Sequence, residues 1–127
     1  MIVVDTSALM AIILGETEAD ACIEILVSEA EVLISAGTMA EAMIVASRRN
    51  VAAEMTSLID DLGFDVVTVT PASARRMAQA YERWGKGVHP AGLNFGDCFA
   101  YAVASEHSCP LLFVGDDFSK TDLQRAL

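Results

Sequence analysis

Four short, largely apolar and β-branched runs alternate with longer stretches that carry helix boundary signals. The runs cover residues 2–4, 32–35, 64–69 and 111–114. Runs of this kind are typical of strands buried on both faces. Strands that alternate with helices form a parallel sheet, because parallel neighbours must be joined by crossover connections. The sequence therefore predicts an α/β fold in which helices cover both faces of a central, mostly parallel sheet.

Helix start and stop signals divide the remaining segments. Gly15 and Gly63 stand at the C-cap positions of two helices, and Thr70 followed by Pro71 is a strong N-terminal signal. A glycine-rich stretch over 85–93 predicts the one extended loop. The first expected helix covers 8–14 after a cap at Thr6 or Ser7, and the second runs from a Thr17–Asp20 capping box to about residue 30. Further helices are expected over 38–46, over 51–62, from 71 to about 84 and from 94 to about 107, with a brief last helix after Ser119.

The size and composition of the chain limit its class. With 127 residues, of which 54% are hydrophobic, it can build one full core, so we expect a single domain over residues 1–127. Three cysteines without a Cys-x-x-Cys pair argue against a disulfide framework or a zinc knuckle and favour a reducing cytoplasm. No basic signal-peptide region precedes the first apolar run, and no apolar stretch approaches the ~20 residues that cross a bilayer. We therefore expect a soluble cytoplasmic protein with no membrane partner.

The charge balance restricts how this protein could meet nucleic acid. Eight Lys and Arg residues stand against 18 Asp and Glu residues, a net charge of −10. This argues against binding through a general basic surface, because such binding depends on cations that neutralise phosphates. An enzyme that meets a phosphate backbone through bound metal ions remains compatible with the charge.

Acidic residues fall where a parallel sheet binds its ligands, which is the carboxyl edge of the strands. Asp5 ends the first run, and Asp116 and Asp117 follow the last one. Glu41 and Asp97 lie in the first turns of two expected helices. Carboxylates gathered without His or Cys repel one another unless a cation neutralises them, and oxygen ligands suit Mg²⁺ or Mn²⁺. Such a site would perform metal-assisted phosphodiester hydrolysis with one or two ions.

Each acid also has a purely structural explanation. Glu41 stands three residues after a threonine and could complete a capping box. Asp97 could balance the dipole of its helix, and the Asp116–Asp117 pair could be ordinary turn residues. Asp5 is the hardest to explain in this way, because a charge at the end of a buried strand needs a partner.

Four motifs contain these acids: Met1 to Ala8, Ile34 to Glu41, Leu93 to Ala102 (Leu-Asn-Phe-Gly-Asp-Cys-Phe-Ala-Tyr-Ala) and Gly115 to Asp122 (Gly-Asp-Asp-Phe-Ser-Lys-Thr-Asp). The first is weak alone, whereas the last two together are highly specific. With them the sequence resembles, over essentially its whole length, the PIN-domain family and within it the VapC-type toxins of bacterial toxin–antitoxin pairs. The resemblance implies a three-layer α/β/α PIN-like fold and a Mg²⁺- or Mn²⁺-dependent endoribonuclease.

The resemblance also implies roles for single residues. The acids that match the family's metal positions are Asp5, Glu41, Asp97 and Asp117. Because Asp116 stands beside the last of them, either member of that pair could face the metal. Thr6 and Ser7 match the polar pair next to the first aspartate, where a hydroxyl would orient Asp5 or a metal-bound water.

Partners follow from the same resemblance. It implies an RNA substrate, a homodimer and a cognate VapB-type antitoxin, through which alone the protein would meet DNA. A basic residue in the antitoxin tail would be attracted to the acids and compete with the metal. Arg76 and Arg83 lie seven residues apart on one expected helix and, with Lys86, could contact RNA phosphates beside the metal site. They could equally form a solvated helix face.

Three other functions remain open on the sequence. A phosphorylation-dependent receiver also places acids at strand ends, but it usually has an acidic pair after the first strand, where this chain has only Asp5. A PIN-like domain without catalysis would be a binding module, which the four filled acidic positions disfavour. A DNA-directed nuclease of the same superfamily would differ in substrate preference rather than in any residue of this chain.

Overall fold

The computed structural model describes residues 1–127 throughout. Its strands are β1 (Ile2–Val4), β2 (Val32–Ser35), β3 (Asp65–Val67) and β4 (Leu111–Leu112). Its helices are α1 (Thr6–Leu14), α2 (Ala19–Ser28), α3 (Ala36–Arg48), α4 (Ala52–Leu62), α5 (Pro71–Trp84) and α6 (Phe95–His107). None of these helices combines the length and the apolar character needed to cross a membrane.

The four strands form one parallel sheet in the order β3-β2-β1-β4. β1 is central: Ile2 lies beside Val32 of β2, and Val3 lies beside Leu111 of β4. The chain builds the sheet outward from β1 in one direction through β2 and β3, and in the other through β4. In open α/β sheets the carboxyl edge at such a reversal is where ligands bind, and the residue that follows β1 there is Asp5.

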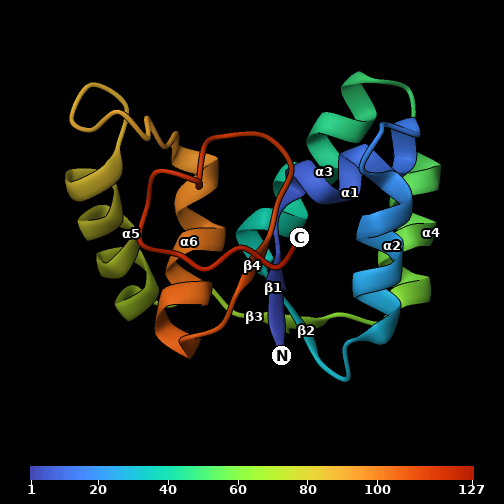
Figure 1. Ribbon diagram of the computed structural model, residues 1–127, viewed down its shortest axis with the longest axis horizontal. Helices are drawn as coiled ribbons and strands as arrows, with labels where there is room; N and C mark the ends of the chain where they lie inside the picture. The colour runs from blue at the N-terminus through green and yellow to red at the C-terminus, as the bar shows by residue number, and fades with distance from the viewer.

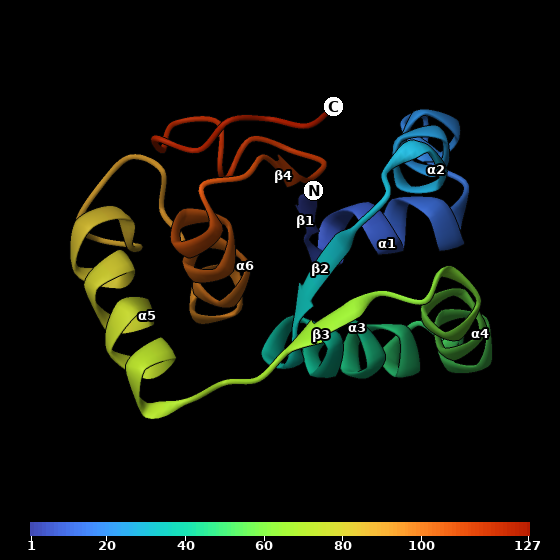
Figure 2. The same cartoon turned by 90° about the horizontal axis from the view of Figure 1, so that it is seen from below.

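Helices cover both faces of the sheet, with α5 and α6 on one side and α1 to α4 on the other (Figures 1 and 2). Alternate residues of β1 supply the two cores. Val3 packs in a cluster with Trp84 and Tyr101, whereas Val4 packs in a cluster with Leu9. Both valines are fully buried, as a strand covered on both faces requires. The predicted three-layer α/β/α fold is confirmed.

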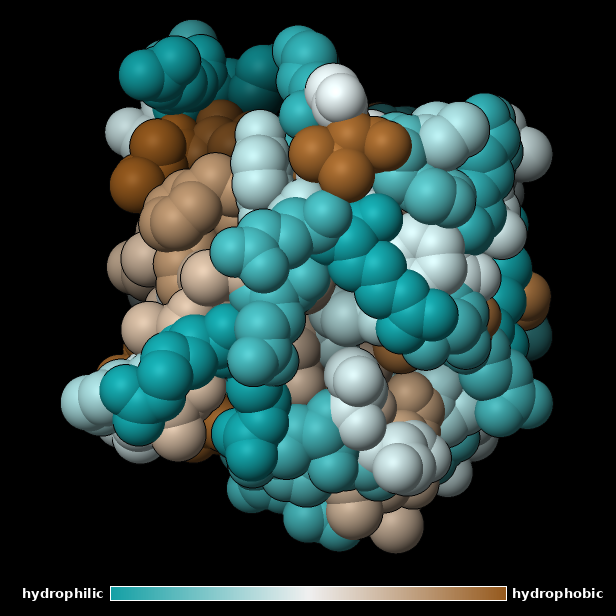
Figure 3. Space-filling model, turned by 90° about the vertical axis from the view of Figure 1, so that its left-hand side faces the viewer, coloured by the Kyte–Doolittle hydropathy of each residue, from teal (hydrophilic) through white to brown (hydrophobic).

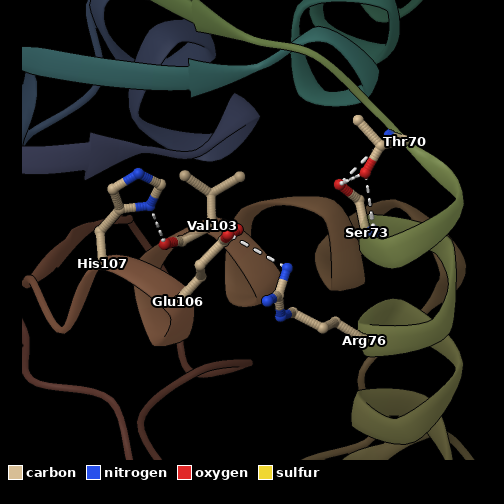
Figure 4. Close-up of polar contacts among 6 residues, drawn as sticks. All are labelled: Thr70, Ser73, Arg76, Val103, Glu106 and His107. Atoms are coloured by element: carbon tan, nitrogen blue, oxygen red, sulfur yellow. Dashed lines mark hydrogen bonds and ion pairs between the residues drawn. The ribbon is translucent and has the colours of Figure 1, made fainter.

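Several helix ends lie where the sequence predicts them. Gly15 and Gly63 adopt the left-handed conformation after α1 and α4, with φ values of 64° and 61°. Thr70 caps α5 in a reciprocal capping box with Ser73 (Figure 4), and Pro71 is the first residue of the helix. These ends were predictable because each depends on a local signal.

Other helix starts differ from the prediction. Asp5, rather than Thr6 or Ser7, is the N-cap of α1. α2 begins at Ala19 with no side-chain cap, so the Thr17–Asp20 capping box is absent. Helix α3 begins at Ala36 because the Ser35 side chain accepts a hydrogen bond from the backbone of Gly37.

The end of the chain is also irregular, so the brief helix expected after Ser119 is wrong. The Ser119 and Thr121 hydroxyls donate to the carbonyls of Asp116 and Phe118, at 2.6 and 2.7 Å. Such short side-chain bonds compete with helix formation and favour turns. The chain then returns to the edge of β4, where Arg125 pairs with Leu111. Strands β3 and β4 are shorter than expected, at residues 65–67 and 111–112.

Candidate active site

Four separate elements bring acidic side chains to the carboxyl edge of the sheet. Asp5 follows β1, Glu41 lies on α3, Asp97 lies in the first turn of α6, and Asp117 lies in the segment after β4. Asp5, Asp117 and Glu41 all carry charges that raise the pKa of Asp97. We call this group the acidic cluster.

Asp5 is a helix cap whose second oxygen has no partner. Its Oδ2 accepts hydrogen bonds from the backbone and hydroxyl of Ser7, at 3.0 and 2.7 Å, whereas its buried Oδ1 accepts none. Burial and, to a smaller extent, the charge of Glu41 together raise the pKa of Asp5 to about 6, although these hydrogen bonds act to lower it. The Ser7 hydroxyl also accepts a 3.0 Å bond from the backbone of Val114, which ties α1 to the end of β4.

Glu41 is held by a residue from another element. Because α3 begins at Ala36, Glu41 lies beyond the first turn and forms no capping box. Its Oε1 instead accepts a 2.7 Å hydrogen bond from the Thr6 hydroxyl. Its Oε2 lies against Gly96 so closely that a Cβ at that position would overlap it. The carboxylate is thus confined between α1 and α6.

Asp97 combines a capping role with a place in the acidic cluster. Its Oδ2 accepts from the backbone of Asn94 at 3.0 Å, and its own backbone donates to the Asn94 side chain at 2.8 Å. Burial, together with the charges of Asp5, Asp117 and Glu41, raises the pKa of Asp97 to about 7, although the Asn94 bond acts to lower it. Asp97 thus has a structural role as the N3 partner of the Asn94 cap, beyond the dipole role expected from the sequence, and this role does not account for its whole environment.

The Asp116–Asp117 pair is exposed, and its two members differ. The charge of Asp117 is among the causes that raise the pKa of Asp97. The carbonyl of Asp116 accepts from the backbone and hydroxyl of Ser119, which makes Asp116 the first residue of a turn. We therefore count Asp117, rather than Asp116, with the acidic cluster, in line with the expectation from the sequence.

The composition of the acidic cluster decides which ligand fits it. No three of the chain's His, Cys, Asp and Glu side chains enclose a ready-made metal site. The acidic cluster nevertheless contains only oxygen donors, two of its carboxyl groups have raised pKa values, and Oδ1 of Asp5 has no hydrogen-bond partner. A hard cation such as Mg²⁺ or Mn²⁺ would fit this site, because it binds oxygen ligands and favours ionised carboxylates. Nearby Cys98 offers no nucleophile, because burial and the charge of Asp97 raise its pKa to about 11.

The predicted basic residues lie on or just after α5. Arg76 pairs with Glu106 at 3.1 Å (Figure 4), and Arg83 contacts Asp122 at 3.6 Å. Glu106 is nine residues beyond Asp97 on α6, which is about 13 Å along the helix axis. Lys86 is exposed in the loop that leads to α6. The structure thus keeps Arg76 away from the acidic cluster, while Arg83 and Lys86 lie toward the end of α5 that joins α6.

Gly96 was not predicted as a site residue. A glycine in the first turn of a helix costs helix stability, and that cost is a signal of close approach by another group. Thr38 was considered only as a helix start, yet it is fully buried, its hydroxyl is unpartnered and its carbonyl lies 3.4 Å from the Thr6 hydroxyl. The sequence carries no local signal for that arrangement.

Comparisons with known proteins agree with this fold and motif set. Residues 2–123 match the PIN domain. Ribonuclease VapC42 of Mycobacterium tuberculosis is 41% identical, with 98% of each chain covered, and Ribonuclease VapC28 of the same organism is 42% identical, with 98% of this chain and 97% of that one covered.

Solved structures also share the fold at lower identity. The crystal structure of Mycobacterium tuberculosis VapC20, described as a Sarcin-Ricin loop cleaving toxin, superposes with a TM-score of 0.78 at 19% identity, over 97% of this chain and 96% of that one. A toxin–antitoxin complex from Klebsiella pneumoniae gives 0.74 at 19% identity, over 100% of this chain and 98% of that one. The chain belongs to the PIN domain family and, within it, to the VapC proteins.

Proposed function

We propose that this protein is the toxin of a toxin–antitoxin pair and that it hydrolyses RNA phosphodiester bonds as a Mg²⁺- or Mn²⁺-dependent endoribonuclease. The acidic cluster carries the proposal, because it combines four carboxylates, two of which, Asp5 and Asp97, have pKa values raised by their burial and by neighbouring acidic charges. RNA is favoured as the substrate over DNA because relatives 41% and 42% identical over nearly the whole chain are named ribonucleases.

The chain's own residues would prepare the metal site. Asp5 and Asp97 would hold the cation, together with Glu41 and Asp117, and the bound cation would activate water and polarise the phosphate. Ser7 fixes one oxygen of Asp5 and leaves Oδ1 free for the metal. Thr6 fixes Glu41, and Asn94 fixes Asp97. A nearby positive charge favours the ionised carboxyl, so loading would lower both raised pKa values.

RNA contacts outside the acidic cluster would come from the basic residues of the α5 region. Arg83 and Lys86 are exposed near the end of α5 that joins α6, where phosphates beside the metal would pass. Arg76 is paired with Glu106 farther along the helix pair, so it would meet only RNA that extends in that direction.

An antitoxin partner is supported by the toxin–antitoxin complex that shares this fold. Its tail would bring a basic residue to the acidic cluster, where it would compete with the metal. DNA would then be bound by the antitoxin rather than by this chain, whose net charge of −10 disfavours direct binding.

A homodimer is supported by a mostly apolar patch on a strongly acidic molecule. We define the apolar face as Ile44, Val69, Tyr81, Phe95 and Phe99, which line two adjoining grooves of about 560 and 300 Å³. Figure 3 shows apolar side chains gathered along one edge of the α5 side. Only Glu41 and Glu82 add charge to these grooves. Two copies could meet here without bringing their many acids together.

The decisive experiment measures cleavage of structured and single-stranded RNA by the purified protein with Mg²⁺, Mn²⁺ or EDTA. Asp5→Asn, purified identically, tests the site, and Asp60→Asn on α4 is the matched control for loss of a distant carboxylate. We expect cation-dependent cleavage that Asp60→Asn retains and Asp5→Asn loses. Equal activity in wild type and Asp5→Asn would reject the site, absent activity would favour a binding module, and faster cleavage of DNA of the same sequence would favour a DNA nuclease.

A further inference from the structure

Glu41 lies at the boundary between the acidic cluster and the apolar face. It lines the smaller of the two grooves of that face, together with Ile44, Phe95 and Phe99. The Phe95 and Phe99 rings meet edge to face at 5.1 Å between their centres, and Ile44 and Phe95 are 58% and 71% exposed. The Glu41 side chain therefore borders the apolar side chains that a second copy of the protein would cover.

The same carboxylate contacts the immediate neighbours of the two most buried acids. Its Oε1 accepts the 2.7 Å hydrogen bond from Thr6, the residue that follows Asp5. Its Oε2 lies against Gly96, the residue that precedes Asp97. Asp5 and Asp97 are 4% and 8% exposed, and Oδ1 of Asp5 has no hydrogen-bond partner. A cation held by these acids would therefore lie at the edge of the apolar face.

A contact between two copies would double the charge at this edge. In a two-fold dimer the same patch of each copy faces the partner, so Glu41 and Glu82 of both copies would border one contact. These two are the charged residues that line the grooves of the apolar face. Like charges across an interface are unfavourable, and the loss of water around them adds to the cost. The metal-free protein therefore meets repulsion at the surface that is otherwise best suited to self-association.

The two glutamates differ in their distance from the acidic cluster. Glu41 is a member of the cluster, and a cation bound there would offset its charge, because opposite charges attract more strongly near a protein surface than in bulk water. Glu82 lies on α5, is exposed and lines the larger groove only. The apolar face thus carries one charge that a bound cation would neutralise and one that it would leave unchanged.

We propose that a second copy of this chain docks on the apolar face preferentially when the acidic cluster holds a divalent cation, and that Glu41 couples the two events. This coupling rests on the proposed function, because it requires both the metal site and the dimer. Coupling is reciprocal, so a cation that strengthens the dimer must bind the dimer more tightly than the monomer. Couplings between two sites typically change an affinity by about 5- to 150-fold.

The first test measures the dissociation constant of the dimer by sedimentation equilibrium, in Mn²⁺ and in EDTA at equal ionic strength. We expect the constant to be about tenfold lower in Mn²⁺. Asp5→Asn should lose most of this difference, because Asp5 is a metal ligand that lines neither groove. Equal constants for the wild type in Mn²⁺ and EDTA would overturn the coupling. A difference that Asp5→Asn retains in full would also overturn it, because the cation would then act on the general charge of the protein.

Charge-removing variants then test whether Glu41 is the coupling residue. Glu41→Gln keeps an acceptor for the Thr6 hydroxyl, Glu82→Gln removes the other charge of the apolar face, and Asp60→Asn on α4 removes a charge outside both grooves. In EDTA we expect both glutamine variants to dimerise several-fold more tightly than Asp60→Asn. Glu82→Gln should still respond to Mn²⁺, whereas Glu41→Gln should not. A Glu41→Gln protein that dimerises like Asp60→Asn in EDTA, or that responds fully to Mn²⁺, would overturn the role of Glu41.

The reciprocal measurement separates failure of the coupling from failure of the proposed function. Mn²⁺ affinity is measured at protein concentrations below and above the dissociation constant of the dimer, and we expect tighter binding above it. Equal Mn²⁺ affinity in monomer and dimer would overturn the coupling alone. A protein that binds Mn²⁺ but stays monomeric at every concentration would overturn the proposed homodimer and the coupling with it. A dimer that binds no Mn²⁺ would overturn the proposed metal dependence and, again, the coupling.

Discussion

Burial has the same effect on Asp5 and Asp97, although different neighbours hold them. It raises their pKa values to about 6 and about 7, from an ordinary value of 3.8. The folded protein therefore binds these two protons more tightly than the unfolded chain does. The stability that this contributes is full below about pH 4 and is lost as the pH rises to between 6 and 7. Above that range the metal-free protein carries two ionised, buried acids that oppose folding.

Asp97→Asn should therefore stabilise the metal-free protein most at high pH. Asparagine keeps an oxygen for the Asn94 bond and removes the charge. We expect the Tm to rise by about 5 °C or more at pH 8, by clearly less at pH 5, and RNA cleavage to be lost. Scanning calorimetry at both pH values in EDTA measures this, with Asp60→Asn as the control. A rise of equal size at both pH values would show that ionisation of Asp97 does not destabilise the folded protein.

The two hydroxyls beside Asp5 should differ in what their removal costs. Ser7 bonds Asp5 and also accepts from Val114, whereas Thr6 donates to Glu41. Ser7→Ala leaves the Val114 backbone N–H without its partner, so we expect a loss of about 1–3 kcal/mol in the free energy of unfolding. Thr6→Val keeps the shape and should change stability by less while weakening Mn²⁺ binding. Urea unfolding and Mn²⁺ titration of both variants distinguish these effects, and identical stability losses would contradict the division of roles.

At the level of elements, the close approach of α3 and α6 depends on one glycine in each helix. Gly96 of α6 leaves room for the Glu41 carboxylate, and Gly37 of α3 leaves room for the Phe99 ring. A carboxylate at the end of a flexible side chain can move away from a new methyl group. An aromatic ring packed between two helices has less freedom, because interiors are close-packed.

Gly96→Ala and Gly37→Ala should therefore have opposite signatures. Alanine favours helix, so Gly96→Ala should leave the Tm unchanged or slightly higher while it displaces Glu41 and lowers cleavage by about tenfold or more. Gly37→Ala overpacks the interface and should cost about 1–3 kcal/mol of stability. Thermal unfolding and cleavage rates of the two proteins test this. Full activity in Gly96→Ala would mean that the position of Glu41 is unimportant.

The elements that were predictable from the sequence are those with local signals. Gly15 and Gly63 end helices through their own backbone conformations, and Asn94 caps α6. The cap of α1 was not predictable, because Asp5, Thr6 and Ser7 can all cap a helix. A bond between Ser7 and the backbone of Val114, 107 residues away, contributes to that choice.

In the candidate site, too, some features were predictable from the sequence and others were not. Its acidic residues were predictable because they were expected after buried strands or in the first turns of helices. Their convergence was predictable from a parallel sheet with β1 at its centre. The hydrogen bond that Glu41 accepts from Thr6 was not predictable, because the two residues lie 35 positions apart in the sequence. The chain end after Ser119 was misjudged, because turn-forming hydroxyls there outweigh helix propensity.

Over the whole molecule, charge and apolar surface are unevenly distributed. With a net charge of −10, two copies repel each other unless they meet where acids are scarce. The apolar face is such a place, and Phe95 in it is 71% exposed. Large apolar side chains rarely gather on the free surface of a monomer without a partner.

Phe95→Glu should therefore break the proposed homodimer without unfolding the subunit. An exposed phenylalanine contributes little to the core of a single chain, but a glutamate there would be desolvated beside its copy in the dimer. We expect light scattering after gel filtration to give a dimer for the wild type and a monomer for Phe95→Glu, with similar Tm values. Val27→Glu on α2, where the valine is 70% exposed, should remain dimeric. A dimeric Phe95→Glu, or a monomeric wild type at tens of micromolar, would exclude the apolar face as the contact between copies and leave the antitoxin to cover it.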